Sequence, residues 1–321
     1  MNTPEKIAIL LPCYNEEVTL NKVINDFKTE FPNADIFLYD NNSTDNSVAI
    51  AKQNKVIVRY EFRQGKGNVV RSMFKQVEAD IYIMADADDA FCAKDAHKMI
   101  EKMQQTGADM IIGNRMSKKQ YQTHNKRRFH GLGNNLVRWL INKLFQTELT
   151  DIMTGYRVFN RHFVKNIPIL SSGFEVETEM TLHAIDKNFH IVEVPVGYKD
   201  RPENSHSSLN TFSDGLLIIK TILWLFKDYK PLGFFSLLSL VLFFLSIFIA
   251  SPVIMEFIET SLVPRLPTAI LALGIMVLSV FSLFVGFILD TIARQHKFNY
   301  ELNLKQHASQ TSFIKDQSFR R

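Results

Sequence analysis

The stretch IYIMADADDAF, residues 81–91, joins four apolar residues to three carboxylates, Asp86, Asp88 and Asp89. A short, continuous apolar run is typical of a strand buried on both faces of a sheet. Crowded carboxylates repel one another and raise one another's pKa unless a positive charge lies between them. The stretch therefore predicts a buried strand that ends either in a solvated surface turn or in a site that holds a cation.

Similar apolar runs recur through residues 1–210, at 6–12, 34–40, 55–61, 80–86 and 108–113. Segments with helical spacing lie between them, such as EEVTLNKVINDFKTEF and AKDAHKMIEKMQQTG. Strands that alternate with helices predict an α/β domain with a mainly parallel sheet covered on both faces. Ligands bind beyond the carboxyl ends of the strands in such sheets. Polar groups follow three of these ends, at residues 14–16, 40–43 and 86–89, so we expect a site at this edge.

Two uncharged stretches, residues 232–254 and 268–289, each match the roughly 20 residues that a helix needs to cross a bilayer. Two buried helices of a soluble core are the alternative, which two such neighbouring stretches disfavour. Lysines and arginines lie outside both stretches, whereas the connecting loop has only Arg265. The positive-inside rule then predicts that both termini are cytosolic. We expect a membrane region at 231–290 and a basic cytosolic tail at 291–321.

Residues 211–230 contain apolar residues, Trp224 and interspersed lysines, a pattern that favours an interfacial amphipathic helix over a plain linker helix. The net charge of +4 on 321 residues is too small to indicate a nucleic-acid partner. Cys13 and Cys92 lack metal-ligand spacing, so we expect two reduced thiols. The N-terminus has no apolar run preceded by basic residues, which predicts that no signal peptide is present.

Four motifs, LLPCYNEE, YDNNSTDNS, RQGKGNVVR and MADADD, occur in an order and spacing that resemble the family 2 glycosyltransferases, which have the nucleotide-sugar-binding GT-A fold. The later GNR, TGYRVF and YKDRPENSHSSLNT, followed by two membrane-length segments, resemble the polyisoprenyl-phosphate glycosyltransferases more narrowly. Dolichyl-phosphate mannose synthase and bacterial undecaprenyl-phosphate glucosyltransferases belong to that group. The motifs cover about residues 6–212, and their ordered combination carries the resemblance.

The resemblance implies that Asp86 and Asp88 are the catalytic acids and bind Mg²⁺ or Mn²⁺ at the donor diphosphate. These cations prefer oxygen ligands and need only one or two carboxylates from a protein. Asp89 stays outside the predicted ligand set, as a helix cap or a hydrogen-bond acceptor behind the ligands. Relatives often have Gln at the position of Ala90, which leaves a third ligand undefined.

The other donor contacts that the resemblance implies are Pro12, Tyr14 and Glu16 at the nucleobase, Asp40 at a ring N–H, Lys66 at a phosphate, and Arg201. Asn41 replaces the second acid of the family's usual pair. Simpler alternatives exist for some of them. Glu16 can lie in the first turn of a helix, Pro12 can end a strand, and RQGKGN can be a surface turn.

For the acceptor, the resemblance implies that Arg115, Arg127 and Arg157 bind a lipid phosphate. The alternative for Arg157 is a structural arginine that pairs with Asp151. The basic run at 118–128 is otherwise a solvated or lipid-facing loop. Three acids, Glu175, Glu177 and Glu179, either face the acceptor or are exposed helix acids.

These observations predict inverting transfer of one sugar from a nucleotide sugar, with UDP favoured, to a polyprenyl phosphate such as undecaprenyl phosphate. A phosphate monoester is largely dianionic at neutral pH, so it can attack without a general base. Another lipid acceptor and a non-catalytic nucleotide-sugar-binding protein remain alternatives, and two spans are too few for a processive synthase. We expect a multi-pass protein of the cytoplasmic membrane with a cytosolic catalytic domain, and a homo-oligomer is left open.

Overall fold

A computed structural model of the chain describes residues 5–116, 138–173, 175–199, 223–224 and 226–319. The chain forms two compact units, residues 1–214 and 215–321. The predicted interfacial helix at 211–230 lies mostly outside the described residues.

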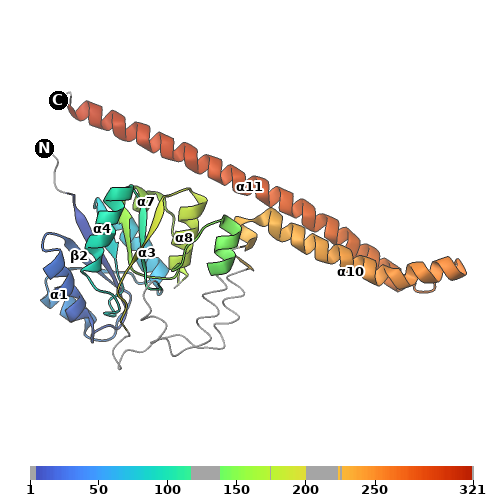
Figure 1. The fold of residues 1–321 in the computed structure, drawn as a ribbon, viewed down its shortest axis with the longest axis horizontal. Helices are drawn as coiled ribbons and strands as arrows, with labels where there is room; N and C mark the ends of the chain where they lie inside the picture. The colour runs from blue at the N-terminus through green and yellow to red at the C-terminus, as the bar shows by residue number, and fades with distance from the viewer. Residues whose placement is uncertain (1–4, 117–137, 174, 200–222, 225, 320–321) are drawn as a thin grey trace. The chain divides into compact units, whose positions relative to one another are not determined.

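A seven-stranded sheet forms the centre of the first unit (Figure 1), with the order β3-β2-β1-β4-β6-β5-β7. The strands are β1 (Ile7–Cys13), β2 (Asp35–Asp40), β3 (Ile57–Tyr60), β4 (Ile81–Met84), β5 (Met110–Asn114), β6 (Arg157–Asn160) and β7 (Ile191–Pro195). Neighbouring strands are parallel, except that β6 runs antiparallel to both β4 and β5. This confirms the predicted α/β class and its five predicted strands, whereas β6 and β7 were not predicted.

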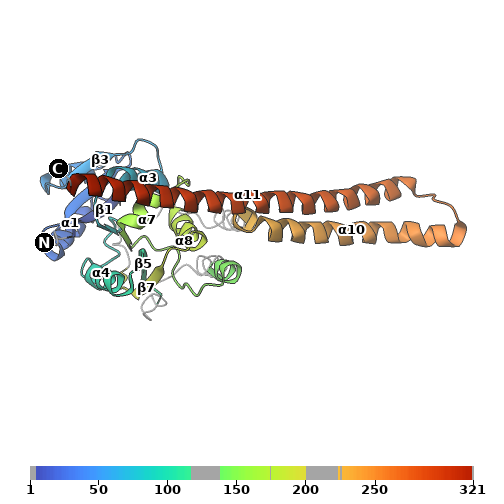
Figure 2. The same cartoon turned by 90° about the horizontal axis from the view of Figure 1, so that it is seen from above.

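Helices cover both faces of this sheet, and Figure 2 shows α3 and α4 on opposite sides of it. The helices are α1 (Leu20–Glu30), α2 (Ser47–Gln53), α3 (Lys66–Gln76), α4 (Asp95–Thr106), α7 (Arg161–Asn166) and α8 (Val176–Asp186). Side chains of α1, α2 and α4 pack in one cluster with Ile9 and Leu11, which face the same way because strand side chains alternate. On the other face Phe74 of α3 contacts Phe159, and Phe159 stacks on Phe163 of α7.

The register brings the carboxyl ends of three parallel strands to a common edge. Cys13 pairs with Asp40, and Leu10 pairs with Met84. The backbone N–H of Asn41 donates to the Cys13 carbonyl at 2.9 Å, which ties the turns after β1 and β2 together. The turns that carry the predicted donor residues therefore start from the same edge, as the sequence predicted.

The second unit is a helical hairpin of α10 (Pro231–Thr260) and α11 (Leu266–Phe319). Its seam consists of small and hydroxyl residues: Ser246 donates to the Ala272 carbonyl at 2.7 Å, and Ser279 donates to the Ser239 carbonyl at 2.8 Å. Ala272, Ser279 and Gly286 recur every seven residues along α11. Such residues let two helix backbones approach closely, and their hydroxyls are satisfied within the hairpin.

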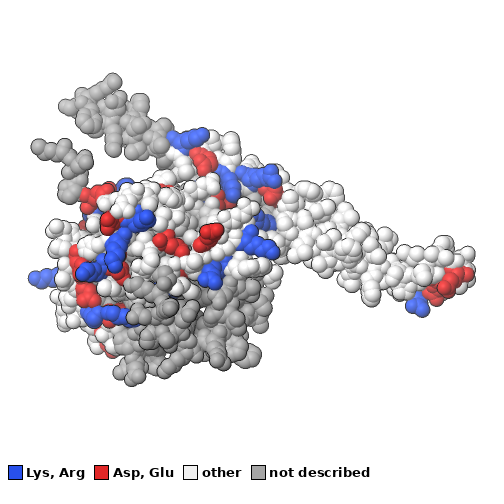
Figure 3. Space-filling model, viewed as in Figure 1, with Lys and Arg blue, Asp and Glu red and all other residues white. Residues whose placement is uncertain are grey.

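The outer faces of the hairpin are apolar and exposed. In the apolar 18-residue stretch of each helix, only 6% of α10 and 17% of α11 is buried within the structure. In Figure 3 the visible surface between the base of the hairpin and its charged tip, which carries Glu256, Glu259 and Arg265, shows neither acids nor lysines or arginines. A core helix of a soluble protein would be mostly buried, so these faces indicate association with a membrane. The predicted spans at 232–254 and 268–289 lie within these helices, and α11 continues through most of the predicted tail.

Candidate active site at the carboxyl edge of the sheet

The three acids after β4 lie in different surroundings. Asp88 is only 3% exposed and accepts a hydrogen bond from the Ala90 backbone N–H at 3.1 Å. Asp89 has a left-handed backbone, with φ of 57°, and its carboxylate lies 2.6 Å from Lys22 Nζ. Its ion pair gives Asp89 a structural partner at the surface, in line with its place outside the predicted ligand set.

Asp86 is paired with a lysine of the chain itself. Lys66 Nζ lies 2.5 Å from Asp86 Oδ1 and 2.6 Å from Glu177 Oε1. Burial lowers the pKa of Lys66, but the two carboxylates outweigh burial and raise this pKa above its ordinary value, so the ammonium stays charged. Lys22 and Lys66 thus supply positive charge among the acids. The crowding of acids at 86–89 therefore does not by itself require a metal.

The glycines beside Lys66 are required by the chain's own backbone. Gly65 has a φ of +123°, and the Gly67 N–H donates to the carbonyls of Ser172 and Gly173 at 3.0 and 3.1 Å. A Cβ atom at Gly67 would overlap the Ser171 carbonyl. The loop that was predicted to approach a phosphate is therefore clamped on the segment 171–173, and it presents the Lys66 side chain, 10% exposed, to the two acids.

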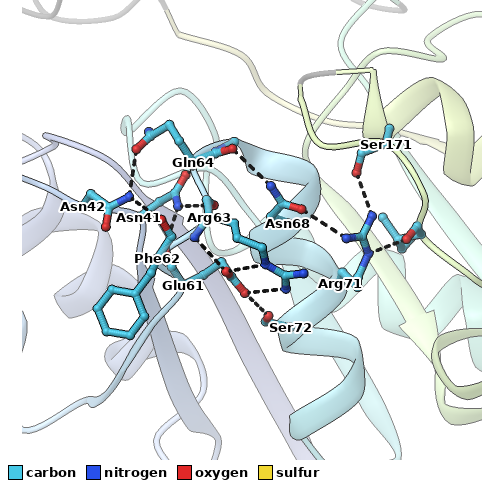
Figure 4. A network of polar contacts seen from close by, with 12 residues as sticks. Asn41, Asn42, Glu61, Phe62, Arg63, Gln64, Asn68, Arg71, Ser72 and Ser171 are labelled. Atoms are coloured by element: carbon cyan, nitrogen blue, oxygen red, sulfur yellow. Dashed lines mark hydrogen bonds and ion pairs between the residues drawn. The ribbon is translucent and has the colours of Figure 1, made fainter.

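Asn41 organises the segment that leads into this loop (Figure 4). Its Nδ2 donates to the carbonyls of Glu61 and Arg63 at 2.7 and 2.9 Å, and its Oδ1 accepts from the Gly65 N–H at 2.7 Å. A carboxylate at position 41 could not donate these bonds. This accounts for an amide where the family's usual pair has a second acid.

Two further side chains of this network fix its neighbours. The Arg63 guanidinium, 3.0 Å from Glu61, and a hydrogen bond from Ser72 outweigh burial and lower the pKa of Glu61 to about 2. Arg71 of α3 donates to the carbonyls of Ile169 and Leu170 at 2.6 and 2.8 Å. It also contacts the Ser171 carbonyl, as Figure 4 shows. The helix that begins at Lys66 is thereby joined to the segment on which its glycines pack.

The acids of α8 are not exposed helix acids, apart from Glu175 before the helix. Glu177 is 5% exposed, and Glu179 is buried and accepts from the backbone N–H groups of Leu170 and Ser171 at 2.8 and 2.9 Å. The sequence contained a signal for this. Residues two positions apart on a helix point in nearly opposite directions, so Glu177 and Glu179 cannot both face solvent on a helix that covers a sheet.

The predicted nucleobase residues gather around the turns after β1 and β2. Pro12 is half-buried near the end of β1, and Tyr14 is 50% exposed. The Glu16 N–H donates to Ser47 Oγ at 2.9 Å, which places the backbone of this residue beside the first residue of α2. Asp40 is buried, and both of its oxygens lie 3.3 Å from the Ser43 N–H. The structure thus brings together the residues that were predicted for the nucleobase.

Arg115 lies at the end of β5 and is paired with Asp151. Its Nε and Nη2 each lie 2.8 Å from an oxygen of Asp151, and its guanidinium carbon lies 5.5 Å from the centre of the Tyr198 ring. The structural alternative for Arg157 assumed that it pairs with Asp151. In the structure Asp151 pairs with Arg115 instead.

Arg157 is fully buried in β6, which corrects its assignment to the lipid phosphate. Its guanidinium donates to the carbonyls of Ile152, Thr154 and Glu177, to Thr181 Oγ1 and to Met110 Sδ. These bonds use all five N–H groups of an arginine, so none remains for a phosphate. Burial lowers its pKa to about 10, which still leaves it charged at neutral pH. Arg127 and Arg201 lie outside the described residues.

The residues around Asp86 fit a divalent cation that takes most of its ligands from elsewhere. Within the described ranges, no group of three His, Cys, Asp or Glu side chains could hold a metal alone. A Cβ atom at Gly155 would overlap Asp86 Oδ2, so this glycine leaves space at the carboxylate. Two carboxylates suit Mg²⁺ or Mn²⁺, which usually keep waters and substrate phosphates as ligands. The site therefore fits a cation that binds together with a diphosphate.

The chain is similar in sequence to known glycosyltransferases. Residues 8–167 match the family described as glycosyl transferase family 2. Glycosyltransferase AglJ of Haloferax volcanii is 30% identical over 237 residues, 74% of this chain and 77% of that protein. Protein RfbJ of Shigella flexneri is 45% identical over 120 residues, 37% of this chain and 93% of that protein.

Solved structures support the fold. The glucosyl-3-phosphoglycerate synthase of Mycobacterium tuberculosis in complex with UDP superposes with a TM-score of 0.56 at 18% identity, over 70% of this chain and 80% of that chain. The same enzyme with Mn²⁺, UDP-glucose and phosphoglyceric acid gives a TM-score of 0.54, over 70% and 79% of the two chains. The sequence matches show that the chain belongs to glycosyl transferase family 2.

Proposed function

We propose that the protein transfers a single sugar from a nucleotide sugar, with UDP favoured, to a membrane polyprenyl phosphate, with inversion at the anomeric carbon. One observation carries this proposal: a family 2 glycosyltransferase site and two membrane-length helices with exposed apolar faces belong to one chain. A sugar acceptor that resides in the bilayer explains why a catalytic domain of this kind is joined to such a hairpin.

On the donor side, Pro12, Tyr14, Glu16 and Asp40 are proposed to bind the nucleobase, because they surround the same two turns. Lys66 is proposed to meet the diphosphate as a charged ammonium whose loop is fixed by Gly67. Arg201, outside the described residues, is proposed as a further donor contact on the basis of the motif alone.

Asp86 and Asp88 are proposed to hold a divalent cation, in keeping with the Mn²⁺ and UDP-glucose in the complex of the mycobacterial enzyme. When bound, the cation would neutralise charge on the departing diphosphate. The chain's own residues keep the two acids in place: Ala90 donates to Asp88, and Gly155 allows its backbone to lie against Asp86.

On the acceptor side, Arg115 and Arg127 are proposed to bind the lipid phosphate, and Arg157 no longer belongs to this set. Arg115 is kept at the end of β5 by Asp151 and Tyr198. A dianionic phosphate monoester is itself the nucleophile, so the proposal needs no general base and depends on positioning and charge stabilisation.

Radiolabelled UDP-sugars and GDP-mannose, offered with Mn²⁺ to the purified full chain and undecaprenyl phosphate, test this proposal. We expect label in a charged lipid that releases its sugar in mild acid. A parallel reaction with diacylglycerol as the only acceptor is the control and should give no labelled lipid. Transfer to diacylglycerol instead, or nucleotide-sugar binding without transfer to any lipid, would contradict the proposal.

A further inference from the structure

Glu177 is a buried acid to which the proposed function gives no role. It lies in the first turn of α8, it is 5% exposed, and its Oε1 lies 2.6 Å from Lys66 Nζ. Burying a carboxylate carries a desolvation cost that one good ion pair with further hydrogen bonds only roughly offsets. A glutamate at this position therefore calls for an explanation beyond the stability of the fold.

The position of Glu177 is fixed through its own backbone. Its carbonyl accepts a hydrogen bond from Arg157 Nη2 at 2.9 Å, and Arg157 is itself fully buried. Lys66 is fixed from the other side, because the Gly67 N–H donates to the carbonyls of Ser172 and Gly173. The ion pair thus joins α3 to α8, and backbone hydrogen bonds join α3 to the segment 171–173 that precedes α8.

Lys66 has two carboxylate partners, Asp86 and Glu177, and we expect only one of the two ion pairs to persist when a cation binds. Asp86 is a proposed cation ligand, so its interaction with the ammonium weakens when a cation arrives. Glu177 is not in that ligand set and can keep its contact. Without Glu177, the flexible four-carbon side chain of Lys66 would then lose its fixed position. Binding a phosphate would therefore cost conformational entropy of that side chain.

We propose that Glu177 is a positioning residue of the donor site, which holds the Lys66 ammonium beside Asp86 so that it is in place for the donor diphosphate. This inference rests on the proposed function, because it assumes a nucleoside diphosphate at this edge of the sheet. Glu177 acts through Lys66 and does not touch the substrate.

UDP binding to the full chain in lipid nanodiscs, measured by calorimetry with Mn²⁺ present, tests this role in the wild type and in Glu177→Gln, Lys66→Met and the double variant. Each single variant is expected to bind UDP about tenfold more weakly, the effect of one charge-assisted hydrogen bond. Because both changes remove the same interaction, the double variant should bind UDP no more than about threefold more weakly than Glu177→Gln.

Glu175→Gln is the matched control, since Glu175 is exposed and lies two residues before Glu177. It should bind UDP like the wild type. Lys66→Met leaves the buried Glu177 and the partly exposed Asp86 without their lysine, so if it fails to fold, the comparison of Glu177→Gln with the double variant still decides. A further tenfold loss in the double variant, or wild-type UDP affinity in Glu177→Gln, would overturn the proposal. A wild-type chain that binds neither UDP nor GDP would contradict the proposed function itself, and this role with it.

Discussion

At the scale of single residues, the arginines show what a motif can and cannot predict. GNR and TGYRVF place Arg115 and Arg157 in equivalent roles, yet Arg115 is 14% exposed and pairs with Asp151, whereas Arg157 is fully buried with its N–H groups all bonded. Which arginine is buried depends on α8 and on the turn 152–154, whose carbonyls meet only in the folded chain. Asp86, Asp88 and Asp40 were predictable, because an acid directly after an apolar strand must lie at the sheet edge.

Arg157→Lys tests the structural role of Arg157. A lysine keeps the charge but offers three donors, so some of the carbonyls of Ile152, Thr154 and Glu177 would lose their partner. We expect the free energy of unfolding to fall by about 2–4 kcal/mol, seen as a lower melting temperature. UDP and polyprenyl phosphate affinities should decline together. A normally stable variant that has lost only the lipid affinity would restore Arg157 to the acceptor site.

Glu61 predicts a pH dependence of stability. Its pKa of about 2 in the folded chain is below the ordinary value of 4.5, so the ionised form is the one that folding favours. The stabilisation from Glu61 is therefore complete above pH 4.5 and is lost as the pH falls toward 2. Melting temperatures of the wild type and Glu61→Gln should differ most above pH 4.5 and converge as the pH falls toward 2. A difference that stays constant over this range would contradict the assignment.

At the scale of elements, the long periodic segments were predictable and the short ones were not. Strands β1 to β5 and helices α1 and α4 have clear apolar patterns, whereas β6 has four residues and β7 carries Glu193 in its centre. The clamp between the Gly65–Gly67 loop and the segment 171–173 joins positions about a hundred residues apart. Sequence periodicity contains no information on such a contact, so the glycines were assigned to a phosphate loop, with a surface turn as the alternative.

Gly67→Ala tests this clamp. The new methyl group would overlap the Ser171 carbonyl, a backbone atom that cannot move without displacing its neighbours. We expect a loss of about 1–3 kcal/mol in the free energy of unfolding, together with weaker UDP binding because Lys66 is displaced. Gly107→Asn is the control: Gly107 has a φ of +65°, no atom would lie near its Cβ, and Asn accepts this conformation at a helix end. Equal melting temperatures of the two variants would argue against the clamp.

At the scale of the whole molecule, the chain joins a catalytic unit to a hairpin whose outer faces are apolar. The spans could be predicted from the sequence because the absence of charge over 20 residues leaves few alternatives. The contacts between the two helices could not be predicted from the sequence. The serines at 239, 246 and 279 look like surface residues until their carbonyl partners are known.

Cysteine labelling tests the predicted topology. A single cysteine at Glu259, in the exposed last turn of α10, should react with an impermeant maleimide added to intact cells. A cysteine at Lys297 of α11 should react only after the cells are opened, because the positive-inside rule places the flanking basic residues in the cytosol. Labelling of position 297 in intact cells would show that the orientation is reversed.

The central claim is that Asp88 acts with a divalent cation in sugar transfer, and neighbouring acids allow it to be tested directly. Asp88 is buried at the proposed cation site, whereas Asp89 pairs with Lys22 at the surface. Rates of sugar transfer to undecaprenyl phosphate should be measured for Asp88→Asn, Asp89→Asn and the wild type, with Mn²⁺ and with EDTA. We predict that Asp88→Asn and the EDTA-treated wild type lose about 10²–10³-fold in rate, as for loss of a main source of charge stabilisation, while Asp89→Asn with Mn²⁺ stays near the wild-type rate. A folded Asp88→Asn that transfers sugar at the wild-type rate in EDTA would contradict the account.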